Sequence, residues 1–135
     1  MQNMRLTIDQ ALHQGVAAHS EGKLQEAETL YSAILQSQSN HPDANYNLGL
    51  LRVNSGEAAM ALLLFEKAIA INSSEEKFWL SYIETLIWER QRDDARTALT
   101  DAAAAGFAGE KWPLLIKNCI HKELAVNCLK TWGPY

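Results

Sequence analysis

The sequence predicts an all-α protein of 135 residues in which pairs of helices are stacked one after another. Three observations lead to this fold class. Proline and glycine are scarce, with three and seven residues, while alanine, leucine, glutamate and glutamine abound, which favours helix. The sequence aligns with itself without gaps when it is shifted by 34 residues. Hydrophobic residues make up 47% and charged residues 21%, as in a globular domain that can bury a core.

The 34-residue period extends from residue 8 to residue 107. Small residues recur at fixed places, and a large apolar residue follows them. Small residues at such places predict that two antiparallel helices cross closely there, while the large residue fills the space beside the crossing. The matching sets are Gly15 with Gly49, Gly22 with Gly56, Ala27 with Ala61 and Ala95, Tyr31 with Phe65 and Leu99, and Ile34 with Ala68 and Ala102.

Each unit is expected to contain two helices joined by a tight turn. In the middle unit the first helix begins at about Pro42, because proline suits the first helical position, and it ends at about Ser55. The second helix follows over residues 57–71, where apolar residues recur at helical spacing. Gly56 lies between the two helices and supplies the turn, since glycine takes a positive φ without strain.

Two motifs indicate where first helices begin, and one glycine indicates where the last of the six helices ends. Thr7-x-x-Gln10 and Ser73-x-x-Glu76 both have the form of a capping box, in which a hydroxyl and a side chain three residues later satisfy backbone amides. Gly106 predicts the end of the sixth helix, because glycine is favoured just beyond a helix C-terminus.

A seventh helix is predicted over residues 110–130, with the tail TWGPY ending it. A stack of repeats exposes apolar surface at its end, so this helix is expected to cap the stack. Its apolar residues include Cys128, and the second cysteine, Cys119, lies nine residues away. On one helix the two would point to opposite sides, so no disulfide joins them and a reduced, cytoplasmic protein is expected.

Composition and motifs exclude several classes of function. The net charge is −4, and neither residues 1–74 nor residues 75–135 carry the basic excess of a nucleic-acid-binding protein. No apolar segment has the length of a signal peptide or a membrane span. Phosphate-binding glycine loops, His-x-x-x-His, Cys-x-x-Cys and Gly-x-Ser-x-Gly motifs are all absent from the sequence. We therefore expect no enzyme, no catalytic residue, no metal, no cofactor, and no nucleic-acid or membrane partner.

The units resemble tetratricopeptide repeats. That family favours Trp, Leu, Gly and Tyr at positions 4, 7, 8 and 11 of each unit, and Ala, Phe, Ala and Pro at positions 20, 24, 27 and 32. The resemblance implies one domain over residues 1–135, a right-handed superhelical stack of three helix pairs (repeats 8–41, 42–75 and 76–109) with residues 110–130 as the capping helix. The middle unit matches through Leu48, Gly49, Ala61, Phe65 and Ala68, the first through Gly15, Ala27 and the aromatic Tyr31, and the third through Trp79, Ala95 and Ala102.

Three residues depart from the family's pattern, and they suggest that the first or the third helix pair is widened. Gln14 replaces the usual leucine, Ile83 replaces a glycine, and Arg90 replaces the turn glycine.

In tetratricopeptide proteins the first helices line a concave groove, which is the usual ligand-binding face. The resemblance therefore implies that the partner is a protein or peptide segment bound in this groove. Its apolar side chains would form a strip that is exposed without a partner, and their loss would spare the fold. Alternatives are that the seventh helix or the tail fills the groove, or that the groove closes a homodimer. The candidate residues are Leu12, His13, Val16, Tyr46, Asn47, Leu50, Val53, Lys77, Leu80, Ser81, Glu84, Ile87 and Trp88.

Two known types of tetratricopeptide groove give a further comparison. The type that clamps a C-terminal carboxylate pair is matched by Asn47 and Lys77 only. The asparagine ladder of O-linked N-acetylglucosamine transferases is matched by Asn47 alone, although the stretch HPDANYNLGLL resembles repeats found ahead of such enzymes and of other bacterial glycosyl- or sulfotransferases. A regulatory or substrate-presenting module of such a transferase is the second functional hypothesis, and a structural homo-oligomer is the third.

Overall fold

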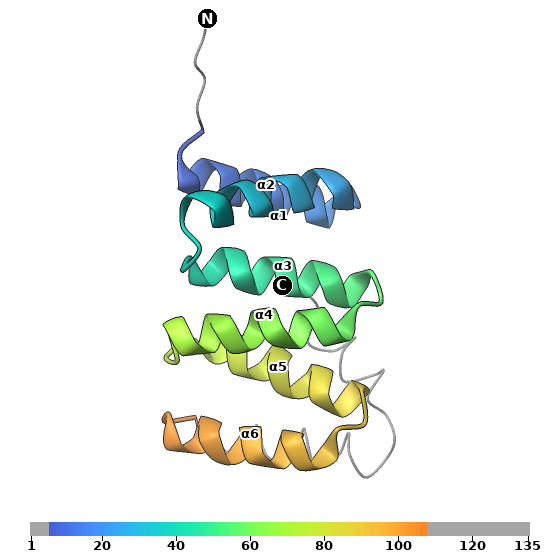
Figure 1. The fold of residues 1–135 in the computed structure, drawn as a ribbon, viewed down its shortest axis with the longest axis vertical. Coiled ribbons are helices and arrows are strands. Elements are labelled where there is room, and N and C mark those ends of the chain that lie inside the picture. The colour runs from blue at the N-terminus through green and yellow to red at the C-terminus, as the bar shows by residue number, and fades with distance from the viewer. Residues whose placement is uncertain (1–5, 108–135) are drawn as a thin grey trace, which may run out of the picture.

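The computed structural model describes residues 6–107 and contains six α-helices in that range (Figure 1). No strand is present among these residues, and the helices form three pairs stacked along the long axis, which confirms the predicted fold class. The predicted capping helix over residues 110–130 lies outside the described residues. The helices are α1 (Ile8–Ser20), α2 (Leu24–Ser37), α3 (Pro42–Asn54), α4 (Ala58–Ile71), α5 (Glu76–Trp88) and α6 (Arg92–Ala104).

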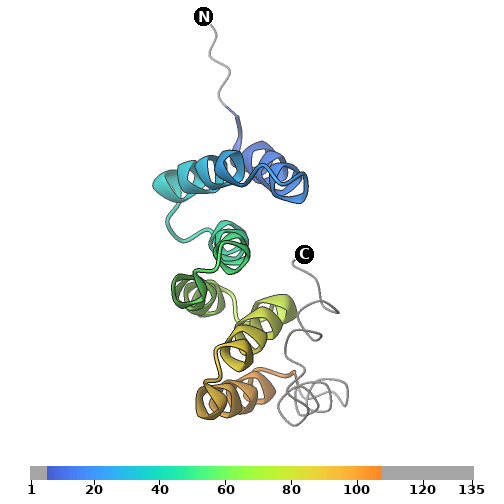
Figure 2. The same cartoon turned by 90° about the vertical axis from the view of Figure 1, so that its right-hand side faces the viewer.

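The two helices of each pair pack together, and consecutive pairs meet through α2 against α3 and α4 against α5. First helices also contact one another, α1 with α3 and α3 with α5. The side view shows α3 and α4 end-on, with α4 below α3 and offset from it to one side (Figure 2). We call the surface formed by α1, α3 and α5 the first-helix face and the surface formed by α2, α4 and α6 the second-helix face.

The first and second helices of a pair cross where the sequence places small residues. A Cβ atom built at Gly49 would lie 2.5 Å from Cε1 of Phe65, and one built at Gly15 would lie 2.5 Å from Cε1 of Tyr31. Only glycine allows the helices this approach. The alanines at the corresponding place in the second helices have no exposed surface: Ala27, Ala61 and Ala95.

The turns inside the three pairs share one left-handed conformation at the same position. After α3, the amide of Glu57 donates to the carbonyl of Arg52 at 2.7 Å and the amide of Gly56 donates to that of Val53 at 3.1 Å, the pattern of a Schellman motif. The predicted turn glycine is thus confirmed, as is Gly106 with φ of 106° after α6. The φ values inside the pairs are 81° at Gly22, 79° at Gly56 and 60° at Arg90.

One of the two predicted capping boxes is present. The amide of Gln10 donates to Oγ1 of Thr7 at 3.1 Å, and the amide of Thr7 donates to Oε1 of Gln10 at 2.9 Å. The box predicted at Ser73 is wrong, because α5 begins only at Glu76 and its N-cap, Glu75, makes no side-chain capping hydrogen bond.

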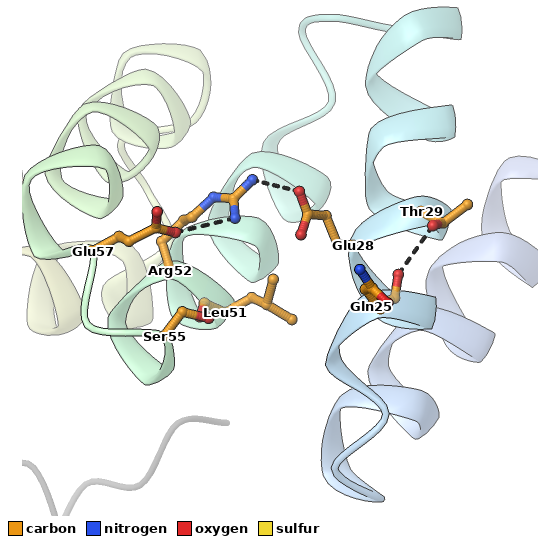
Figure 3. Close-up of polar contacts among 7 residues, drawn as sticks. All are labelled: Gln25, Glu28, Thr29, Leu51, Arg52, Ser55 and Glu57. Carbon is orange, nitrogen blue, oxygen red and sulfur yellow. Dashed lines mark hydrogen bonds and ion pairs between the residues drawn. The ribbon is translucent and has the colours of Figure 1, made fainter.

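A charged network joins the first two helix pairs (Figure 3). The guanidinium of Arg52 on α3 donates to Oε2 of Glu28 on α2 at 2.8 Å and to Oε1 of Glu57 at 3.2 Å. One repeat later, Leu62 and Leu86 take the places of Glu28 and Arg52, and both belong to one buried apolar cluster. The two junctions of the stack are therefore held by different chemistry at equivalent positions.

Candidate functional site

The candidate residues all lie on the three first helices, but their exposure differs more than the sequence predicted. Trp88, the last residue of α5, is 42% exposed. Four others are half-buried, and three are buried. The half-buried residues are Leu12, Val16, Val53 and Leu80, and the buried residues are Tyr46, Leu50 and Ile87.

The expectation that every apolar candidate faces the groove and is dispensable for the fold is wrong for the buried three. Tyr46 is 5% exposed, and its ring lies 5.6 Å from the ring of Phe65 and 4.9 Å from that of Phe78 between centroids. Leu50 belongs to the same cluster, and Ile87 belongs to the cluster between α5 and α6. Stacking of the second helix pair on the third covers Tyr46 and Leu50, and packing of α5 against α6 covers Ile87, so all three side chains contribute to stability.

A pair of hydroxyl groups links α3 to α5 beside this cluster. The Tyr46 hydroxyl and Oγ of Ser81 lie 2.9 Å apart and share a hydrogen bond. Nζ of Lys77 lies 5.4 Å from the centroid of the Tyr46 ring, within cation–π range, and 3.9 Å from Oδ1 of Asp43. Burial raises the pKa of Tyr46, so the phenol stays neutral and can both donate and accept.

Glu84 is the most unusual group on this face. Glu84 is 5% exposed, and its carboxyl oxygen Oε2 has no hydrogen-bond partner among the described residues. Burial raises the pKa of the Glu84 carboxyl to about 9. The group is therefore a neutral acid at neutral pH, and a neutral carboxyl can donate a hydrogen bond as well as accept one.

Two polar candidates are held by their own helices. Nδ1 of His13 donates to the carbonyl of Asp9 at 2.8 Å, and Nδ2 of Asn47 donates to the carbonyl of Asp43 at 2.9 Å.

One polar contact on this face joins two residues that are not among the candidates. Nδ2 of Asn54 on α3 donates to Nε2 of His19 on α1 at 2.6 Å. Burial lowers the pKa of His19, which favours the neutral ring that can accept this bond. His19 and Asn54 are 35 residues apart in the sequence, one more than the repeat length, and so are Tyr46 and Ser81. A search for polar residues at this separation could have found the contact.

Three helix pairs with a 34-residue period, small residues at each crossing and a shared turn conformation define a tetratricopeptide-type helical repeat. Solved structures with this arrangement include SycD, a type III secretion translocator chaperone of Yersinia enterocolitica, with 17% identity, 93% of this chain and 87% of that chain covered, and a TM-score of 0.68. PcrH in complex with the chaperone-binding region of PopD gives 17% identity, 98% and 100% coverage, and a TM-score of 0.69. PilF of Pseudomonas aeruginosa gives 22% identity, 95% and 62% coverage, and a TM-score of 0.69.

These likenesses establish the fold, and the predicted link to glycosyl- or sulfotransferases finds no support among them. No family model and no curated protein matches the chain. Within residues 6–107, no helix is long and apolar enough to span a membrane, and no group of His, Cys, Asp and Glu side chains is arranged to hold a metal ion.

Proposed function

We propose that this protein is a non-catalytic scaffold that binds an apolar segment of a partner protein along the first-helix face. The observation that carries the proposal is the exposed indole of Trp88 at the end of α5, together with half-buried apolar side chains on α1, α3 and α5. Tryptophan with apolar neighbours is the residue type that dominates binding energy at protein interfaces.

Polar groups between these apolar residues fit a peptide backbone. The Tyr46–Ser81 hydroxyl pair offers both a donor and an acceptor. Lys77 adds one positive charge at the edge. A segment that places apolar side chains along the face and hydrogen-bonds through its main chain would use all of them.

The comparisons support this kind of partner. SycD has been solved in complex with a peptide of the translocator YopD, and PcrH in complex with the chaperone-binding region of PopD. Both share this fold over nearly the whole of the present chain. We therefore propose that this protein also binds a segment of a larger protein. The spacing of Cys119 and Cys128 predicts that it does so in the cytoplasm.

The test starts from a display library of short random peptides selected on the full chain. The selected peptide is labelled, and its affinity is measured by fluorescence anisotropy. Trp88→Ala should weaken binding about thirtyfold, since truncating a tryptophan that anchors an interface costs ~2 kcal/mol or more, and should leave the far-ultraviolet circular dichroism unchanged. Met60→Gln, on the second-helix face, is the matched control and should bind as the wild type does. Equal affinity of Trp88→Ala and wild type would place the site elsewhere, and light scattering that shows a dimer broken by Trp88→Ala would instead support self-association.

A further inference from the structure

The second-helix face carries an exposed apolar strip on one helix alone. Met60, Leu63 and Ile71 on α4 are 51%, 65% and 36% exposed. They lie at i, i+3 and i+11, which places them on one side of the helix. We call these three residues the α4 strip.

The other two repeats show that the fold does not need this strip. α2 and α6 pack against their own first helices as α4 does, yet they carry mostly polar residues at the equivalent positions. A surface helix normally has a polar outer side, so a helix that is apolar there has an outer side that meets something else. The equivalents of Met60, Leu63 and Ile71 are Glu26, Thr29 and Ser37 in α2, Asp94 and Thr97 in α6, and Ala105, which directly follows α6.

An acidic hollow lies on the side of the strip that faces α6. Its volume is about 230 Å³, and its lining includes the carboxylates of Glu66, Asp94 and Asp101. The hydroxyl of Tyr82 in its lining donates to Oε2 of Glu66 at 3.0 Å. Leu63 and Glu66 are one helical turn apart on α4, so apolar surface and negative charge are adjacent.

We propose that the α4 strip and this acidic hollow form a second docking site whose occupant is a basic amphipathic helix of a partner protein. Its apolar side chains would pack on Met60, Leu63 and Ile71, as ridges of one helix pack against another. A lysine or arginine beside them would enter the hollow and meet the carboxylates. A second copy of this chain is a poorer fit, since its own Glu66, Asp94 and Asp101 would approach the same charges.

The probe for this site is a labelled synthetic helix of leucine and lysine, with a helix of leucine and glutamate of the same pattern as its control. Fluorescence anisotropy against the full chain should show binding of the lysine helix only. The triple variant Met60→Gln, Leu63→Thr and Ile71→Ser keeps the net charge and uses residues of the kind that α2 carries. It should lose at least tenfold in affinity while its urea midpoint stays unchanged. Asp94→Asn with Asp101→Asn should weaken binding and reduce its salt dependence.

Four results would overturn the proposal. The first is that the lysine helix does not bind the wild type. The second is that it binds the triple variant equally well, which would show that it is attracted unspecifically to an acidic protein. Light scattering shows a wild-type dimer that the triple variant lacks, which would assign the strip to a second copy. Anionic lipid vesicles bind the wild type and not the triple variant, which would assign it to a membrane surface. Trp88→Ala separates this site from the first-helix face, because it should bind the lysine helix as the wild type does.

Discussion

Gly49 and Phe65 face each other across the crossing of α3 and α4 so closely that Gly49 has no room for a side chain. A Cβ there would lie 2.5 Å from Cε1 and 2.8 Å from Cδ1 of the Phe65 ring. In the third pair the same two places hold Ile83, which is fully buried, and Leu99. A small residue faces a large one in the second pair, and two residues of middle size face each other in the third. The third pair thus packs two aliphatic side chains where the second pair packs one aromatic ring against a bare backbone.

Gly49→Ala should lower the free energy of unfolding by ~1–3 kcal/mol, although alanine in a helix interior usually gains about 1 kcal/mol over glycine. The ring of Phe65 must move, and it is packed on all sides. Urea denaturation measures the change. Adding Phe65→Leu should recover part of the loss, because it makes room for the new methyl group. A Gly49→Ala variant as stable as the wild type would show that the crossing relaxes freely.

The repeat was readable from the sequence because the constraints at a crossing are steric and local. Gly49, Phe65 and the turn residue Gly56 are each restricted in size or backbone conformation, so the first repeat has a glycine, an aromatic residue and a glycine at the same three places. The burial of Tyr46 and Ile87 was not readable. A repeat position tells which side of a helix a residue occupies, while the overlap of one helix pair with the next decides how much of that side is covered.

Some equivalences in the repeat involve different residue types and are invisible to a search for matching letters. Nδ2 of Asn45 donates to the carbonyl of Ser39 at 3.2 Å, and Nε1 of Trp79 donates to that of Ser73 at 3.0 Å. Both pairs are separated by six residues and lie one repeat apart. The amide of Asn45 and the indole of Trp79 thus each donate one N–H to a carbonyl of the equivalent loop, so different side chains make the same contact in two repeats.

Arg90→Gly should raise the free energy of unfolding by ~0.5–1 kcal/mol. Arg90 has φ of 60°, the only positive φ of a non-glycine residue in the described range, and glycine adopts this conformation without strain. Thermal unfolding of the two proteins measures the gain. Gly56→Arg is the converse control and should lose a similar amount, since no atom lies within 4 Å of a Cβ there and only backbone strain is added. A neutral or destabilising Arg90→Gly would mean that the Arg90 side chain contributes more than its backbone costs.

Arg52→Met should destabilise the protein by about 1–2 kcal/mol, because it removes charge-assisted hydrogen bonds to both Glu28 and Glu57 from a side chain that is 18% exposed. Raised salt should narrow the difference between variant and wild type. The double variant Glu28→Leu with Arg52→Leu copies Leu62 and Leu86 from the next junction and should be at least as stable as the wild type, since well-packed apolar pairs often replace ion pairs without loss. If the double variant is no more stable than Arg52→Met, the two junctions are not interchangeable.

Glu84→Gln should stabilise the protein at neutral pH and flatten its response to pH. Burial raises the pKa of Glu84 from the ordinary 4.5 to about 9, so the folded state keeps a proton that the unfolded state releases above about pH 4.5. Stability from this group is therefore complete below pH 4.5 and falls as the pH rises towards 9. Glutamine imitates the neutral acid at every pH, so the gain at pH 7 should be about 1–3 kcal/mol. Urea denaturation at pH 5, 7 and 8 measures it, with the exposed Glu89→Gln as a control for the loss of one negative charge. Parallel pH profiles for Glu84→Gln and the wild type would mean that Glu84 is ionised in the folded protein.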